Sequence, residues 1–176
     1  VLVERCCQTI ARRRFRSGLP IEVKKSYRTP RAQRWSAETL TGLPFPTLSW
    51  AASVVECEVD PVTFETEIRG IWAAVSCGEL LNPAVARKTV ENGIFHALWW
   101  CSSTHGSLRE PKFEALPPIT IEFVKPDTRT LSGGIEELAG SIIPSAYVSA
   151  VAQATGRYFD SLPITPELIH RYTEDM

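Results

Sequence analysis

The segment LSWAASVVECEVDPVTFETEIRGIWAAVSCG, residues 48–78, carries the clearest alternating pattern in this sequence. Apolar residues alternate with acidic ones through VECEVD, residues 55–60, which predicts a strand with one polar face. The same alternation returns in FETEIR, residues 64–69, and Asp60-Pro61 between the two strands favours a turn. The segment therefore predicts a β-hairpin. Its second strand continues into the almost wholly apolar IWAAVSCG, whose end we expect to be buried.

Helices are predicted on the C-terminal side of this hairpin. Residues 82–100 begin with Asn82, a favourable N-cap, and Pro83, which suits the first helical position. Gly93 lies inside this helix at a cost of about 1 kcal/mol relative to alanine. We therefore expect another backbone or a ligand to approach Gly93 closely. A second helix is predicted from Ser141, as its cap, to Thr155.

One further strand and a C-terminal helix are predicted in the rest of the chain. PPITIEFVKP, residues 117–126, predicts a strand. Pro144 falls in the first turn of the helix that starts at Ser141, where its missing N–H is harmless, and Gly156 ends that helix. Thr165 and Pro166 start a C-terminal helix. Because strands and helices mix without strict βαβ alternation, we expect the α+β class. The sheet is predicted to be mixed or antiparallel, with the hairpin at about 48–75 and helices packed against it.

The N-terminal part is basic. Residues 1–35 predict a helix over 2–17 and a strand over 21–29, followed by a loop of roughly fifteen residues that precedes the hairpin. The expected second domain is 36–176, and the two parts are expected to form one continuous folding unit. A basic arm can bind nucleic acid, but cations also suit the negative end of a helix dipole. We expect no nucleic-acid partner and leave open docking on an acidic partner surface.

Composition excludes several classes of protein. No run of about 18 apolar residues is present, so no membrane span is expected, and the first residues lack the order of a signal peptide. Five cysteines at scattered positions argue against a disulfide framework and favour a reducing cytoplasm. Cys101 and His105 have a ligand-like spacing but no second pair, so no metal site built from side chains is expected.

Glu136 and Glu137 follow the glycine turn Gly133-Gly134, immediately before the long helix. Two interpretations are open at this point. Acidic side chains at the positive end of a helix are favourable, and the pair then acts as a solvated cap. Alternatively, one carboxylate is a catalytic base, because a glycine turn lets the backbone approach a large ligand without a Cβ in the way.

Two longer segments resemble one family in the same order. ASVVECEVDPVTFETEIRGIWAAVSCGELLNPAVARKTVENG, residues 52–93, is similar to a "VEVDPETGEV" hairpin followed by "DVG", "NP" and a "GQIEGG" helix. These motifs occur in the molybdenum-binding subunit of the xanthine dehydrogenase and aldehyde oxidase family. GGIEELAGSIIPSAYVSAVAQATGRYFDSLPITPE, residues 133–167, resembles that family's "GxGEP" turn, alanine-rich helix, "ATG" and "LPxTPE". The order and spacing agree from about Ile21 to Glu167, which implies a molybdenum-cofactor-binding-domain-like fold.

The resemblance implies a molybdenum hydroxylase, which oxidises an aldehyde or N-heterocycle with oxygen from water through a molybdenum–molybdopterin cofactor. The acid of the "GxGE" turn is the family's general base, and in register with the following helix it falls on Glu137. The Gly133-Gly134 turn and Thr89 are implied to lie near the cofactor. Thr89 stands where the family has a cofactor-contacting Gln. Glu91 keeps its family place, and Glu136 stands where the family has a glycine against the cofactor.

Members of the family are much longer, and their upstream region supplies most of the cofactor pocket. The resemblance therefore implies partners that share the cofactor with this chain: the pterin-binding region, iron–sulfur and in some cases flavin subunits, and a small-molecule substrate. We expect no cofactor bound by this chain alone, and a homo-oligomer stays open. The alternative is a divergent, non-catalytic structural or interaction domain that keeps the fold. Thr89 and Glu136, as departures from the family pattern, favour that alternative.

Overall fold

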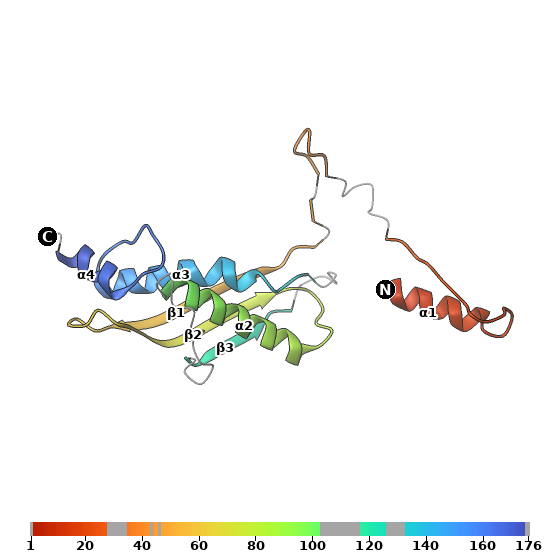
Figure 1. Ribbon diagram of the computed structural model, residues 1–176, viewed down its shortest axis with the longest axis horizontal. Helices are drawn as coiled ribbons and strands as arrows, with labels where there is room; N and C mark the ends of the chain where they lie inside the picture. The colour runs from red at the N-terminus through yellow and green to blue at the C-terminus, as the bar shows by residue number, and fades with distance from the viewer. Residues whose placement is uncertain are drawn as a thin grey trace. The chain divides into compact units, whose positions relative to one another are not determined.

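The computed structural model describes residues 2–27, 35–42, 44–45, 47–102, 117–125 and 133–174. The chain divides into two compact units, Val1–Pro46 and Thr47–Met176. Each unit is described by itself below, with the labels of Figure 1.

The first unit contains one helix, α1 (Leu2–Arg13), within its described residues. The helix begins where the sequence predicts and ends four residues early, in a turn at residues 14–16. The strand predicted over 21–29 is wrong for residues 21–27, which have no regular secondary structure. A strand needs a partner backbone for its hydrogen bonds. The described part of this unit offers one isolated bridge, between Ser36 and Thr41.

The second unit is built on a three-stranded sheet in the order β1-β2-β3, counted over the described residues. The strands are β1 (Trp50–Val59), β2 (Thr66–Ser76) and β3 (Ile119–Phe123). β1 pairs antiparallel with β2, and β2 pairs parallel with β3, which confirms the predicted hairpin and mixed sheet. The hairpin turn is held by Asp60, whose Oδ1 accepts the N–H groups of Val62 and Thr63 at 2.7 and 2.8 Å.

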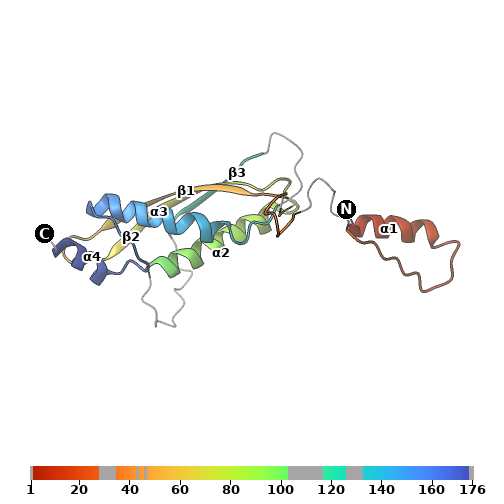
Figure 2. The same cartoon turned by 90° about the horizontal axis from the view of Figure 1, so that it is seen from above.

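Helices α2 (Pro83–Ser102) and α3 (Leu138–Thr155) lie side by side on one face of the sheet, and no described helix of this unit covers the other face (Figures 1 and 2). The short helix α4 (Pro166–Glu174) follows. The predicted caps are confirmed: Asn82 Oδ1 accepts the N–H of Ala84 at 3.1 Å, and Thr165 Oγ1 accepts that of Leu168 at 3.3 Å. Gly156 ends α3 with φ of 69°. The α+β class predicted from the sequence is confirmed.

The start of α3 differs from the prediction. The helix begins at Leu138, so Ser141 is not its cap, and Pro144 lies in the second turn rather than the first. The physical reason is tertiary packing, because Ala139 is buried against α2 and this contact extends the helix toward its N-terminus. A Cβ on Gly93 would lie 2.9 Å from Ala139 Cβ, so the close approach expected at Gly93 is another helix.

The core fills the space between the sheet and the two long helices. Its largest fully buried side chains are Tyr147, Ile71, Ile94, Ile143, Ile164, Ile169, Val75, Val90, Val151 and Cys101. No polar or charged residue of the described part of the chain is fully buried. The layer between the sheet and the middle of α2 and α3 is therefore mainly apolar, with the Tyr147 hydroxyl as a polar atom within it.

Candidate functional site

A pocket of about 300 Å³ lies where α3 begins. Two segments far apart in the sequence form it: the residues that lead into β1 and the turn that leads into α3. The lining residues are Thr47, Leu48, Ser49, Gly134, Glu136, Glu137, Leu138 and Ser141. The structure thus brings the predicted glycine–carboxylate turn together with a segment that sequence analysis did not connect with it.

Glu136 and Glu137 are both exposed, and both line this pocket. Glu137 occupies the N-cap position of α3 with φ of −98° and ψ of −4°, a helical conformation, and its side chain makes no capping hydrogen bond. An N-cap usually has an extended backbone, which turns its side chain back onto the first helical N–H groups. The carboxylate of Glu137 is therefore not engaged in capping its own helix.

Gly133 fixes the turn against the sheet. Its N–H donates to the Cys77 carbonyl oxygen at 2.8 Å, which ties the turn to the chain just beyond β2. A Cβ at Gly133 would overlap Ser49 Oγ, so a larger residue there would require the Ser49 hydroxyl to move. At Gly134 an added Cβ would lie 3.4 Å from Glu136 Oε2, an ordinary contact. The first glycine thus packs closely on the Ser49 hydroxyl, whereas a Cβ at the second would meet only an ordinary contact.

Ser49 is the residue that sequence reasoning missed. Its Oγ is buried and has no hydrogen-bond partner within the described part of the chain. A buried hydroxyl without a partner costs about 1–3 kcal/mol, so such an atom calls for an explanation. The letters LSW carry no signal for this role, because Ser49 is placed against Gly133 by the fold and not by any local pattern.

Thr89 and Glu91 lie on α2. Thr89 is four residues before Gly93, and so lies on the same face about 6 Å nearer the start of α2. Since Gly93 faces the first turn of α3, Thr89 lies toward the same end of the helix pair as the Glu136-Glu137 turn. Its hydroxyl donates to the Val85 carbonyl oxygen at 3.0 Å. Glu91 is two residues from Gly93, a spacing at which helical side chains do not share a face.

The charge of the pocket limits what it can hold. Two carboxylates and two serine hydroxyls line it, and none of its lining residues is cationic. Carboxylates accept protons and hydrogen bonds, whereas a phosphate group is held by cations and N–H donors. The pocket therefore suits a proton-accepting role beside a ligand and does not suit the binding of a phosphate.

The residues described in the structure contain no group of three or more His, Cys, Asp or Glu side chains that could hold a metal ion. Cys101 is fully buried in the core, and burial raises the pKa of its thiol to about 11. His105, the other half of the pair considered in the sequence, lies outside the described residues. No helix among the described residues has the length and apolar character needed to cross a membrane.

Residues 3–104, more than half of the chain, match the family described as the molybdopterin cofactor-binding domain. The chain belongs to this family. Among curated proteins it is similar to the large subunit of nicotine 6-hydroxylase from Paenarthrobacter nicotinovorans, with 25% identity over 171 residues. That match covers 81% of this chain and 21% of the relative, so the chain spans about a fifth of the length of the relative.

Two solved structures show the same fold. Aldehyde oxidoreductase from Desulfovibrio gigas superposes with a TM-score of 0.67 and 22% identity, over 77% of this chain and 16% of that one. Quinoline 2-oxidoreductase from Pseudomonas putida 86 gives a TM-score of 0.56 and 23% identity, over 66% of this chain and 17% of that one. The molybdenum-cofactor-binding-domain-like fold predicted from the sequence is therefore confirmed.

The residues present fit one side of the family's cofactor. The pocket at the start of α3 has a volume of about 300 Å³, which is the lower limit of the usual range of about 300–1,000 Å³ for ligand pockets. It is therefore small for a molybdenum–molybdopterin group. Its orphaned Ser49 Oγ and uncapped Glu137 suit a ligand edge that offers a hydrogen-bond donor and a proton. Its lack of cationic lining residues leaves a phosphate to be bound elsewhere.

Proposed function

We propose that this chain is the C-terminal component of a molybdenum hydroxylase, in which Glu137 is the general base. The observation that carries the proposal is the uncapped Glu137 carboxylate, which shares a pocket with Thr47, Leu48 and Ser49 from the segment that matches the molybdopterin cofactor-binding domain family. Bound in an assembly, the molybdenum–molybdopterin group would supply oxygen transfer to the substrate and accept two electrons. The residues that would face it are Glu137, Gly134, Ser49 and, on α2, Thr89.

The role of this chain is to move a proton. Hydroxylation of a carbon by water converts C–H and H₂O into C–OH, two protons and two electrons. Glu137 accepts one of these protons, because a carboxylate within hydrogen-bond reach of the reacting oxygen is a competent general base. Glu137 is exposed in the chain by itself, so the rest of the subunit must close over the pocket to exclude water.

The proposed partners supply what this chain does not: the binding of the pterin and an acceptor for the two electrons. A polypeptide that binds the pterin and its phosphate is proposed, because no cationic side chain is found among the described residues that line this pocket. The two electrons require an acceptor, for which iron–sulfur or flavin subunits are proposed. An aldehyde or N-heterocycle of small size is the proposed substrate class. A cytoplasmic location is proposed with them, in keeping with five free cysteines.

The test starts from native cells, with this chain purified together with its neighbours and bound molybdenum measured. In that complex Glu137→Gln should lower kcat for hydroxylation by about 10²–10⁴-fold with molybdenum retained, because only the proton acceptor is lost. Glu136→Gln, the neighbouring carboxylate of the same pocket, is the matched control and should change kcat far less. Full activity of Glu137→Gln would contradict the assignment of the base.

A second candidate is favoured by Glu136. This carboxylate lines the same pocket as Glu137, and two like charges in one site repel each other and a bound anion. On this candidate the chain is a non-catalytic interaction domain that keeps the fold. A stable chain that purifies from native cells without any molybdenum-containing partner would establish it.

A further inference from the structure

Strand β1 lies at the edge of the sheet, and its two halves differ. Within the described residues β1 pairs only with β2, so its outer edge is free. The half from Glu56 to Val59 carries the protection usual for edge strands: Glu56 and Glu58, a register shift between Glu56 and Cys57, and an ion pair from Glu58 to Arg69. The half from Trp50 to Val55, WAASVV, has no charge, no proline and no register shift. We call residues 50–55 the bare half of β1.

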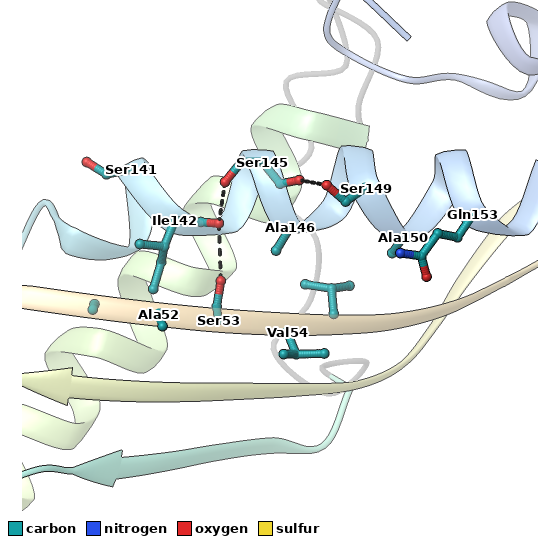
Figure 3. A pocket seen from close by; sticks show the side chains of 12 residues that line it. Ala52, Ser53, Val54, Ser141, Ile142, Ser145, Ala146, Ser149, Ala150 and Gln153 are labelled. Atoms are coloured by element: carbon teal, nitrogen blue, oxygen red, sulfur yellow. Dashed lines mark hydrogen bonds between the residues drawn. The ribbon is translucent and has the colours of Figure 1, made fainter. Parts of the chain in front are cut away.

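A groove of about 510 Å³ runs beside the bare half, between β1 and α3 (Figure 3). Its lining residues are Ala51, Ala52, Ser53, Val54, Val55, Ser141, Ile142, Ser145, Ala146, Ser149, Ala150 and Gln153. Five consecutive residues of β1 take part, which places backbone as well as side chains along the groove. The groove is thus about 17 Å long at the rise of a β-strand.

The chemistry of the groove suits an extended polypeptide. None of its lining residues is charged, so nothing there selects a charged small molecule. The hydroxyls of Ser145 and Ser149 donate to carbonyl oxygens of their own helix at 3.0 and 2.8 Å, and Ser53 Oγ donates to the Ile142 carbonyl oxygen at 3.1 Å. With these hydroxyls already bonded, the polar groups that remain along the groove are the side-chain amide of Gln153 and the free β1 backbone edge.

The open face of the sheet supports the same conclusion. Trp50, Val54 and Trp72 are 70%, 63% and 45% exposed, and Val54 is paired with Trp72 across the two strands. The end of the apolar run IWAAVSCG is buried as predicted, with Val75 and Cys77 at 0% and 3% exposure, whereas Trp72 near its start lies exposed. Continuous apolar strands are typical of sheets covered on both faces. The apolar surface of the bare half therefore exceeds what the described residues of the second unit cover.

From these observations we infer that an extended segment of the polypeptide that carries the rest of the large subunit adds to β1 as a fourth strand, along residues 50–55 and under α3. This inference rests on the proposed function. The occupant is chosen because the curated relative extends far beyond the fifth of its length that this chain spans, so the relative carries much additional chain. Strand addition to a free edge uses main-chain hydrogen bonds for affinity and takes small apolar side chains toward α3.

The experiment uses the affinity-tagged full chain and the molybdenum-containing complex that it captures from native cells. Hydrogen–deuterium exchange is measured on the free chain and on the complex. Alternate amides of residues 51–55 face away from β2, and we expect these to exchange fast in the free chain and slowly in the complex, with little change at residues 57–59. Ser145→Arg with Ser149→Arg fills the groove from exposed positions of α3 and should reduce captured molybdenum per chain by about tenfold or more.

The matched control is Ala154→Arg, an exposed residue of α3 that does not line the groove, and it should capture molybdenum as the unaltered chain does. Full capture by the double arginine variant, with residues 51–55 unprotected in the complex, would overturn strand addition and leave the proposed function intact. If the free chain dimerises through residues 50–55 and the double arginine variant is monomeric, the strand that adds to β1 comes from a second copy of this chain. That result would overturn the inferred partner. If the unaltered chain captures no molybdenum at all, the proposed function fails and the inference fails with it.

Discussion

The middle and the beginning of the α2–α3 helix pair are only two or three turns apart, yet they are built in opposite ways. In the middle, Ile94, Ile143 and Tyr147 are buried among apolar neighbours, and no fully buried polar residue interrupts them in the described part of the chain. At the beginning, the pocket has two exposed carboxylates and a buried hydroxyl without a partner in the same residues. The core is complete within this chain, whereas the pocket is not.

The core residues determine the stability of the fold, whereas the pocket residues are the candidates for binding and catalysis. A close-packed apolar layer needs nothing from outside to hold the helices in place. The pocket measures about 300 Å³, at the lower limit of ligand pockets, and both of its carboxylates are exposed. The comparison predicts that changes in the core act on the free chain, and that changes in the pocket act mainly on the assembled protein.

The largest effect is expected from the core when the pH is raised. Burial raises the pKa of Tyr147 from 10.0 to about 12. Below pH 10 both folded and unfolded states keep the phenol proton. Above it the unfolded state loses the proton first, so the free energy of unfolding falls, by about 2 kcal/mol at about pH 11.5. Urea unfolding across this range measures the loss.

Tyr147→Phe supplies the control, because it removes the titrating group and keeps the ring. Its free energy of unfolding should fall less steeply above pH 10. Cys101, with a pKa of about 11, contributes between pH 9 and 11 in both proteins. Identical slopes for the two proteins would mean that the Tyr147 hydroxyl reaches water, and the core would be less complete than described.

A middle-sized effect is expected at the contact between core and pocket. Gly93→Ala gains about 1 kcal/mol of helix propensity, but its Cβ meets Ala139 Cβ at 2.9 Å, and overpacking costs about 1–3 kcal/mol. We expect a net loss of about 1 kcal/mol in chemical denaturation. Asn92→Ala, at the exposed neighbour, should gain about 0.5 kcal/mol. An equal increase in the free energy of unfolding for both variants would show that the first turn of α3 moves away from the new Cβ at little cost.

The smallest effect is expected in the pocket. Ser49→Ala removes an unpaired buried hydroxyl, so the free chain should be unchanged or gain up to about 1 kcal/mol in stability. Ser53→Ala removes a hydroxyl that donates to the Ile142 carbonyl oxygen and should cost about 1 kcal/mol. A loss for Ser49→Ala as large as that for Ser53→Ala would show that the Ser49 hydroxyl is satisfied within this chain.

The parts of the fold that depend on neighbouring residues were predictable from sequence. Alternation gave the hairpin, and Asn82 and Thr165 gave the starts of α2 and α4, because cap and turn geometry is set within four residues. The start of α3 was not predictable, because Ala139 is drawn into the helix by its contact with Gly93. The strand expected over 21–29 failed over 21–27, since alternation does not supply a partner strand.

The candidate site likewise has residues that were predictable from the sequence and one that was not. The glycine turn and its two carboxylates were visible in the sequence, and the assignment of Glu137 as base came from the family resemblance and stays a prediction. Ser49 could not be identified as a site residue from the sequence. It lies against Gly133 in the fold, although the two are 84 positions apart in the chain. A hydroxyl becomes informative only when the structure shows that it is buried and unpaired.

The bare half of β1 has a consequence for how a cell must produce this chain. Long apolar strand edges without charge or proline are templates for self-pairing and aggregation, and the risk grows with concentration. The proposed fourth strand would cover this edge and remove that risk. Expression of the chain on its own is therefore expected to give less soluble protein than co-expression with the polypeptide proposed to supply that strand.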